Sequence, residues 1–161
     1  MIVVSNTSPI TNLAAVGQLN LLQQLYGTII IPQAVYQELT SAGDTIPGAT
    51  EVQTFNWIQV QQVTNRTLVN SLLNQLHQGE SEAIALAIEL QADWLLIDEE
   101  LGRKVAANNQ LKFIGILGVL IEAKQRGLIP SVKSVLDNLI NQAEFWVTEA
   151  LYNRILQMAG E

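Results

Sequence analysis

Four side chains with oxygen ligands fall at the ends of predicted strands and helices. Asn6 follows the apolar run that opens the chain, and Asp98 follows the apolar run Trp94-Leu95-Leu96-Ile97. Glu38 lies toward the end of the segment PQAVYQEL, and Glu82 lies in the first turn of the segment GESEAIALAI. Parallel α/β sheets bind ligands outside the carboxyl ends of their strands. Such a sheet would bring all four side chains to one edge.

Carboxylates gathered at one edge repel one another unless a cation joins them. Hard oxygen ligands select Mg²⁺ or Mn²⁺ over zinc. Divalent ions held by carboxylates activate water and stabilise an in-line displacement at phosphorus. If the cluster forms, the chemistry that it indicates is phosphodiester hydrolysis.

Each of these residues also has a purely structural interpretation. Glu80 and Glu82 are favourable at a helix N-terminus, where the macrodipole attracts negative charge. Asp98 could be the N-cap of the helix that follows it, and Asn6 could be a turn former that caps its own backbone. Glu38 alone is typical of a solvated helix residue. The metal hypothesis therefore depends on the four positions taken together.

The rest of the chain predicts the elements that would position these side chains. Apolar runs typical of strands occur at Ile2–Ser5, Thr28–Ile31, Trp57–Val63, Trp94–Ile97 and Lys112–Ile114. Helical patterns separate most of them, at Pro9–Val16, Gln18–Tyr26, Pro32–Leu39, Asn65–His77, Gly79–Asp93, Asp98–Asn109 and Ile116–Arg126. Asp44–Ala49 is the most loop-like stretch, and helices at about Ser131–Asn141 and Trp146–Met158 finish the chain.

Strands that alternate with helices predict an α/β fold. We expect residues 1–161 to form a single three-layer domain, with a parallel central sheet of about five strands flanked by helices. The C-terminal helices, at about residues 131–158, would pack on the core or on a partner.

The composition narrows the class of protein. Of the 161 residues, 48% are hydrophobic and 14% are charged, which indicates a compact globular chain. No cysteine is present, which agrees with a cytoplasmic location. No apolar run approaches the roughly 20 residues of a membrane span, and no signal peptide is evident. The net charge of −7 gives no general basic surface, so RNA or DNA would have to bind through a local site.

Several motifs resemble one family in their order and spacing. They are VVSNTSPITNLAAVGQL, IPQAVYQEL, GESEAIALA, LLIDEELGRKVA and IGILGVLIEAKQRGLIPSV. Together they cover nearly the whole chain. On these motifs the chain resembles the PIN-domain family of metal-dependent ribonucleases, which includes the VapC-type toxins of toxin–antitoxin pairs. More narrowly, it looks like an uncharacterised prokaryotic PIN-like subfamily.

The resemblance implies a parallel sheet and a pocket of three or four acids that binds Mg²⁺ or Mn²⁺. The first acid of the family falls on Asn6, and the others fall on the catalytic candidates Glu38, Glu82 and Asp98. Thr7 and Ser8 match the small polar residues that follow the first acid, where a hydroxyl could hold a metal-bound water. The nearby acids that could substitute are Glu80, Glu99 and Glu100.

Asn6 is the departure from the family pattern. An amide oxygen can coordinate a hard cation, but it carries no charge and cannot act as a general base. We therefore expect weaker divalent binding and reduced ribonuclease activity. A catalytically silent module with the PIN fold, which binds RNA or protein, is the alternative. A doubly wound nucleotide-binding domain is disfavoured because no phosphate-binding glycine motif is present.

The remaining expectations concern partners. Arg103 and Lys104 follow Asp98 closely enough for one of them to contact RNA phosphate, although a solvated helix face is the plainer interpretation. The three tryptophans lie in apolar contexts, which predicts core or interface positions and not a base-stacking platform. The apolar surface of the last helices favours a homodimer or an antitoxin partner, with no membrane association.

Overall fold

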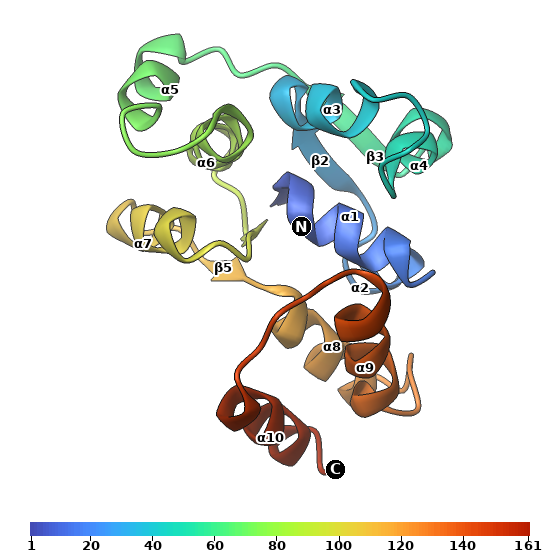
Figure 1. Ribbon diagram of the computed structural model, residues 1–161. Helices are drawn as coiled ribbons and strands as arrows, with labels where there is room; N and C mark the ends of the chain where they lie inside the picture. Colours follow the sequence, from blue (N-terminus) through green and yellow to red (C-terminus); the bar gives the residue numbers. More distant parts are fainter.

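The five apolar runs predicted as strands form one parallel sheet in the computed structural model, which describes residues 1–161 (Figure 1). The strand order is β3-β2-β1-β4-β5, and every neighbouring pair is parallel. The predicted α/β fold with about five parallel strands is therefore confirmed. The strands are β1 (Val3–Ser5), β2 (Ile29–Pro32), β3 (Ile58–Gln61), β4 (Trp94–Leu96) and β5 (Phe113–Ile114).

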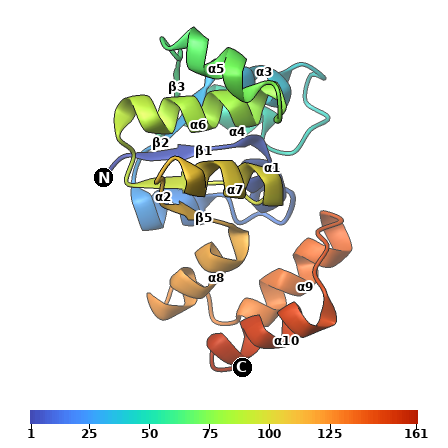
Figure 2. The same cartoon turned by 90° about the vertical axis from the view of Figure 1, so that its left-hand side faces the viewer.

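Helices cover both faces of the sheet (Figures 1 and 2). They are α1 (Thr7–Ala15), α2 (Asn20–Tyr26), α3 (Gln33–Thr40), α4 (Ala49–Thr54), α5 (Arg66–Leu72), α6 (Gln78–Leu90), α7 (Glu100–Asn108), α8 (Ile116–Gln125), α9 (Val132–Gln142) and α10 (Glu149–Met158). Helices α5, α6 and α7 pack on one face, whereas α1, α2, α8 and α9 supply most of the other layer. None of the helices is both long enough and apolar enough to cross a membrane.

Alternate residues of the strands enter two separate hydrophobic cores. Val3 of β1 and Leu96 of β4 belong to a cluster of 26 buried residues, together with side chains of α1, α2, α8 and α9. Val4 and Leu95 point the other way, into a cluster of 14 buried residues beneath α5, α6 and α7. This alternation follows from the two-residue period of a strand, and it explains why the central strands β1, β2 and β4 are apolar, whereas the edge strand β3 carries two glutamines.

Successive strands are added first on one side of β1 and then on the other side. From central β1 the chain passes to β2 and β3 on one side, and then returns to β4 and β5 on the other. Ser5 pairs with Leu96, so β1 and β4 end at nearly the same level. Their carboxyl ends form a topological switch point, which is where open α/β sheets leave a crevice for ligands.

The structure differs from the sequence prediction in several places, and the largest difference in a boundary is at α5, which ends at Leu72 and not at His77. Helix α4 was not predicted, because six residues that follow Pro47-Gly48 are too few for a helical period to stand out. The strand predicted over Trp57–Val63 is shorter, since β3 lies at the sheet edge and pairs only with β2. The last helix begins at Glu149, so Trp146 precedes it.

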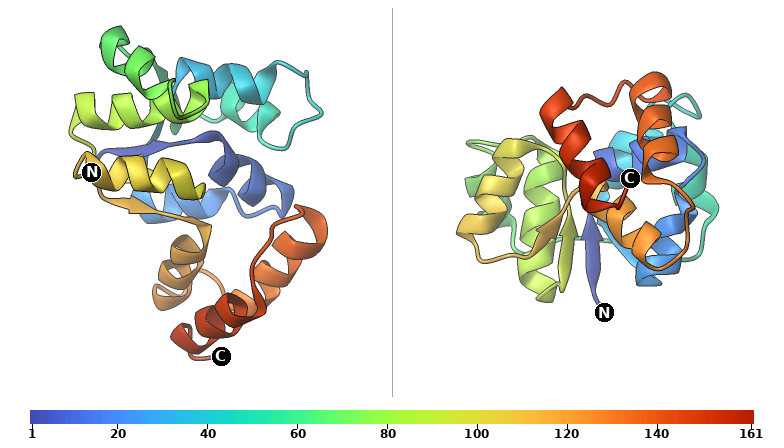
Figure 3. Two further views of the ribbon diagram at one scale, coloured as in Figure 1. Left: turned by 60° about the vertical axis from the view of Figure 1, so that its left-hand side comes forward. Right: turned by 90° about the horizontal axis from the view of Figure 1, so that it is seen from below.

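The chain ends near the C-terminal helices (Figure 3), and the side chain of its last residue, Glu161, contacts α8 and the start of α9. The carboxylate of Glu161 accepts hydrogen bonds from the backbone N–H groups of Val132 and Lys133, at 2.7 and 3.1 Å. It also pairs with Lys124 at 2.8 Å. These contacts hold the pKa of Glu161 at about 2. A carboxylate at the start of α9 is favourable because it meets unpaired N–H groups there.

Candidate metal and nucleic-acid site

Asn6 lies at the switch point, directly after β1. Its backbone N–H donates to the carbonyl of Leu96 on β4 at 3.0 Å, which fixes the residue between the two strands. Asn6 is only 2% exposed, and its Oδ1 atom is buried with no hydrogen-bond partner. The Oγ atom of Ser8 is likewise buried and unpartnered. Buried polar atoms are seldom left unpaired, so the Asn6 oxygen is suited to a ligand.

Asp98 stands across from Asn6, after β4. Its Oδ1 atom accepts from the backbone N–H of Ile116, the first residue of α8, at 2.8 Å. Its Oδ2 atom is buried and has no partner. Burial raises the pKa of Asp98, with a further rise from Glu99, against the opposing effects of the Ile116 N–H and Arg103. The second orphaned oxygen thus belongs to a carboxylate whose burial outweighs the stabilising effects of the Ile116 N–H and the Arg103 charge.

Glu38 reaches this region from α3. Its Oε2 atom accepts a hydrogen bond from the hydroxyl of Thr7, and its Oε1 atom accepts from the N–H of Gly79 at 3.0 Å. A Cβ atom at position 79 would lie 2.5 Å from Glu38 Oε1, so only glycine leaves room for this carboxylate. No local pattern indicates this role for Gly79, because the carboxylate comes from a distant segment.

Glu80 is the acid of α6 that faces the other acids. It is 5% exposed, and its pKa is raised from 4.5 to about 7. Burial is the largest cause, followed by a hydrogen bond to Glu99, the charge of Glu99 and, more weakly, the charge of Glu38. We call Glu38, Glu80 and Glu99 the acid cluster. Glu100 lies outside it, exposed and 3.5 Å from Lys104.

Glu82 is directed away from the acid cluster. Its Oε1 atom accepts from the N–H of Ala34 at 3.0 Å, at the start of α3, and its Oε2 atom pairs with Arg66 at 3.0 Å. Glu82 is 4% exposed, so both of its oxygens are occupied in a buried position. The sequence motif placed the α6 ligand at Glu82, whereas the fold brings Glu80 to the acid cluster.

The acid cluster makes the stability of the metal-free protein depend on pH. Since the pKa of Glu80 is about 7 when folded and 4.5 ordinarily, the folded state binds the proton more tightly. The free energy of unfolding should therefore fall as pH rises from about 4.5 to about 7, by roughly 1–2 kcal/mol after allowance for solvent screening. Glu80→Gln should remove this contribution.

Urea unfolding of the wild type and Glu80→Gln at pH 5 and pH 8, in the presence of a chelator, measures this difference. Asp44→Asn is the matched control, because Asp44 is an exposed acid in the loop before α4. A stability difference between Glu80→Gln and wild type that is the same at both pH values would contradict the prediction.

The oxygen chemistry of the site fits a hard divalent cation. No group of three or more acidic or histidine side chains forms a ready-made metal site in the structure. The candidate donors are instead the two orphaned oxygens of Asn6 and Asp98, together with the acid cluster. Amide and carboxylate oxygens are the ligands that Mg²⁺ and Mn²⁺ accept.

A groove of about 610 Å³ opens beside Asp98. Arg103, Lys104, Phe113 and Trp146 line it. The guanidinium of Arg103 lies over the Phe113 ring, 5.2 Å from its centre. Both predicted phosphate-binding side chains thus lie near a candidate ligand.

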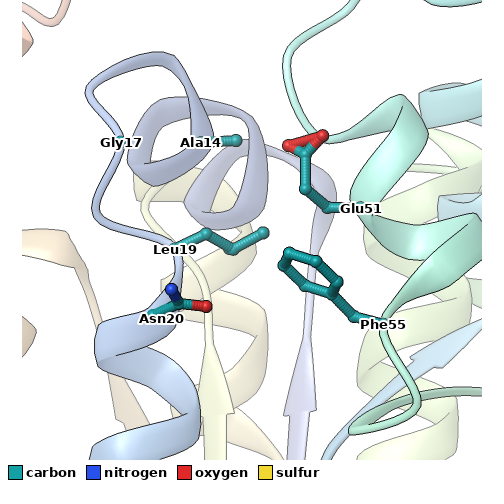
Figure 4. Close-up of a pocket in the computed structure, with 6 residues that line it drawn as sticks. All are labelled: Ala14, Gly17, Leu19, Asn20, Glu51 and Phe55. Atoms are coloured by element: carbon teal, nitrogen blue, oxygen red, sulfur yellow. The ribbon is translucent and has the colours of Figure 1, made fainter.

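A smaller pocket of about 160 Å³ lies at the other end of α1 (Figure 4). Ala14, Gly17, Leu19 and Asn20 form one side, and Glu51 and Phe55 of the α4 region form the other. Glu51 is its one ionisable side chain, and no basic group accompanies it. A single acid offers no site for phosphate chemistry, so the switch point is the better candidate.

The chain belongs to the PIN-domain family. The family model DUF3368, described as a PIN domain, matches residues 2–161. This match confirms the resemblance identified from the sequence motifs. The PIN fold is generally associated with nucleases.

A solved structure supports the same fold. The chain is similar to a PilT N-terminus domain protein from the hyperthermophilic archaeon Sulfolobus solfataricus P2, with a TM-score of 0.59 and 21% identity. The similarity covers 76% of this chain and 93% of the other. At this identity the likeness bears on the fold alone. A comparison with curated proteins gave no match.

Proposed function

We propose that the protein is a divalent-metal-dependent ribonuclease of the PIN type, with activity reduced by Asn6. The observation that carries the proposal is the pair of buried, unpartnered oxygens, Asn6 Oδ1 and Asp98 Oδ2, at the ends of adjacent strands. Mg²⁺ or Mn²⁺ would be held by Asn6 and Asp98 with the acid cluster. Glu80 takes the place that the sequence motif assigned to Glu82.

A bound divalent ion would supply charge stabilisation at phosphorus and make water more acidic. The side chains of the protein would orient the ligands, hold protons and bind the substrate. Glu38 is held in one orientation by Thr7 and the Gly79 N–H. Without metal the pKa of Glu80 is about 7, so near neutral pH this carboxyl group can lose its proton and join the ligand set. Arg103 is placed to contact a phosphate of the RNA.

Cleavage of a labelled single-stranded RNA with increasing Mn²⁺ tests the proposal. The wild type should cleave slowly, and a chelator should abolish cleavage. Asp98→Asn should lower the rate by on the order of 10- to 100-fold, because it removes a charge from the ligand set. Asp44→Asn, which removes an exposed acid, should behave as wild type. Cleavage that persists with chelator or is unchanged in Asp98→Asn would contradict the proposal.

The second candidate function is a silent module that binds RNA or protein through the same site. The amide of Asn6 favours it, because the ligand at this position carries no negative charge where the family pattern has an acid. The two functions separate in one experiment: a silent module would bind single-stranded RNA but would not cleave it at any Mn²⁺ concentration.

A toxin role with an antitoxin partner, or a homodimer, would extend either function. The exposed apolar side chains of Leu101 on α7 and Met158 on α10 support a partner, either an antitoxin or a second copy of the chain, that covers them. Light scattering of the protein alone, and coexpression with the product of an adjacent upstream reading frame, distinguish the two partners.

A further inference from the structure

Trp146 is exposed to an unusual degree for a large aromatic side chain. It is 79% exposed and lies in the connection between α9 and α10, whereas Trp57 is buried and Trp94 is half-buried. Trp146 is therefore not a core residue, and the expectation that it lies in an interface stays a prediction. Exposure of a large flat apolar surface is unfavourable unless something covers it.

The surroundings of Trp146 combine aromatic rings with positive charge. Arg103, Lys104, Phe113 and Leu151 line the same groove. The volume of about 610 Å³ is in the range of pockets that hold small organic groups. The guanidinium of Arg103 lies over the Phe113 ring. The ion pair of Lys104 with Glu100, which also lines the groove, is exposed and therefore weak.

The groove also shares a wall with the candidate metal site. Asp98 lines it, and the charge of Arg103 acts on the Asp98 carboxyl. An anion bound to Arg103 would therefore be next to Asp98. A single-stranded polynucleotide fits this groove, because it offers an aromatic base to Trp146 and backbone phosphates to Arg103 and Lys104.

We propose that Trp146 is a base-stacking residue, on which an unpaired base of a single-stranded nucleic acid rests while its backbone contacts Arg103 and Lys104. This inference rests on the proposed ribonuclease function and deepens it, because it names a residue that binds the substrate. Stacking of an unpaired base on an aromatic ring is tolerant of sequence but needs a base outside a duplex. The groove would thereby select single strands.

Binding measured without metal separates this inference from catalysis. The probes are a labelled single-stranded RNA 12-mer, a DNA 12-mer of the same sequence and the RNA duplex, each titrated with protein in chelator. Trp146→Ala should weaken binding of the single strand about tenfold, and Trp146→Phe should restore most of it. Leu73→Ala, which truncates an exposed apolar residue at the end of α5, is the matched control and should bind as wild type. The two single strands show whether RNA or DNA is preferred.

Tryptophan fluorescence gives a second readout that a purely structural role would not move. Because Trp57 is buried and Trp94 half-buried, quenching by an unlabelled oligonucleotide should come mainly from Trp146 and should vanish in Trp146→Ala. Circular dichroism checks that this variant is folded.

Several results would overturn the inference. They are equal single-strand affinity of wild type and Trp146→Ala, equal wild-type affinity for duplex and single strand, no binding by the wild type, or a wild-type dimer that Trp146→Ala dissociates. Mn²⁺-dependent cleavage without an effect of Trp146→Ala would overturn this inference alone. Binding through Trp146 without cleavage at any Mn²⁺ concentration would support it and overturn the ribonuclease function.

Discussion

Asn6→Asp should bind Mn²⁺ on the order of tenfold more tightly than the wild type and should cleave single-stranded RNA faster. The reason is that position 6 is 2% exposed and presents an unpartnered oxygen toward the switch point. A carboxylate there adds one negative charge to the ligand set, and ligand charge strongly affects the affinity for divalent ions. Without metal the same substitution should destabilise the protein by about 2 kcal/mol, since it buries a charge near Asp98.

Calorimetric titration with Mn²⁺, thermal unfolding with and without Mn²⁺, and RNA cleavage measure these effects. Asn20→Asp is the control, because Asn20 is exposed and the substitution makes the same change of charge. Its affinity for Mn²⁺ should equal that of the wild type. If both Asn6→Asp and wild type cleave robustly and bind Mn²⁺ equally, the amide at position 6 is no handicap and the missing charge does not limit activity.

Glu82→Ala should lower the free energy of unfolding by about 3 kcal/mol. Its carboxylate satisfies the buried N–H of Ala34 and pairs with Arg66, so truncation leaves a buried donor without a partner. Glu82→Gln should cost less, about 1 kcal/mol, because an amide oxygen can still accept from Ala34. Urea unfolding measures both values, and Asp44→Ala, which truncates an exposed acid, should change the stability by less than about 0.5 kcal/mol.

The metal affinity of the same variants separates the two acids of α6. Glu82→Gln should keep an affinity for Mn²⁺ close to that of the wild type, whereas Glu80→Gln should lose much of it. The physical reason is that Glu80 faces Glu38 and Glu99, while both oxygens of Glu82 are occupied elsewhere. Loss of Mn²⁺ binding in Glu82→Gln with stability unchanged would restore Glu82 as the ligand.

The sequence alone predicted the sheet closely. Each end of the five strands lies within two residues of the predicted end. The runs of β1, β2 and β4 are recognisable because strands buried on both faces are uniformly apolar and end abruptly. For the same reason, Asn6 and Asp98 could be placed at strand ends from the sequence. The parallel direction of the strands also follows from the alternation of strands with helices. The short helix α4, by contrast, carried no periodic signal in the sequence.

Only the tertiary structure decided which side chains meet. Glu80 and Glu82 are two residues apart on α6, so they point in directions about 160° apart around the helix axis. Helix α6 is buried on nearly every side, and its sequence therefore has no polar face to indicate its rotation. Trp146 was similarly undetermined, since the apolar pattern predicts a helix from Trp146 to Met158, whereas α10 begins at Glu149 and leaves Trp146 in the connection before it. Local sequence determines where an element begins and ends, but the direction of a side chain depends on neighbours that are distant in sequence.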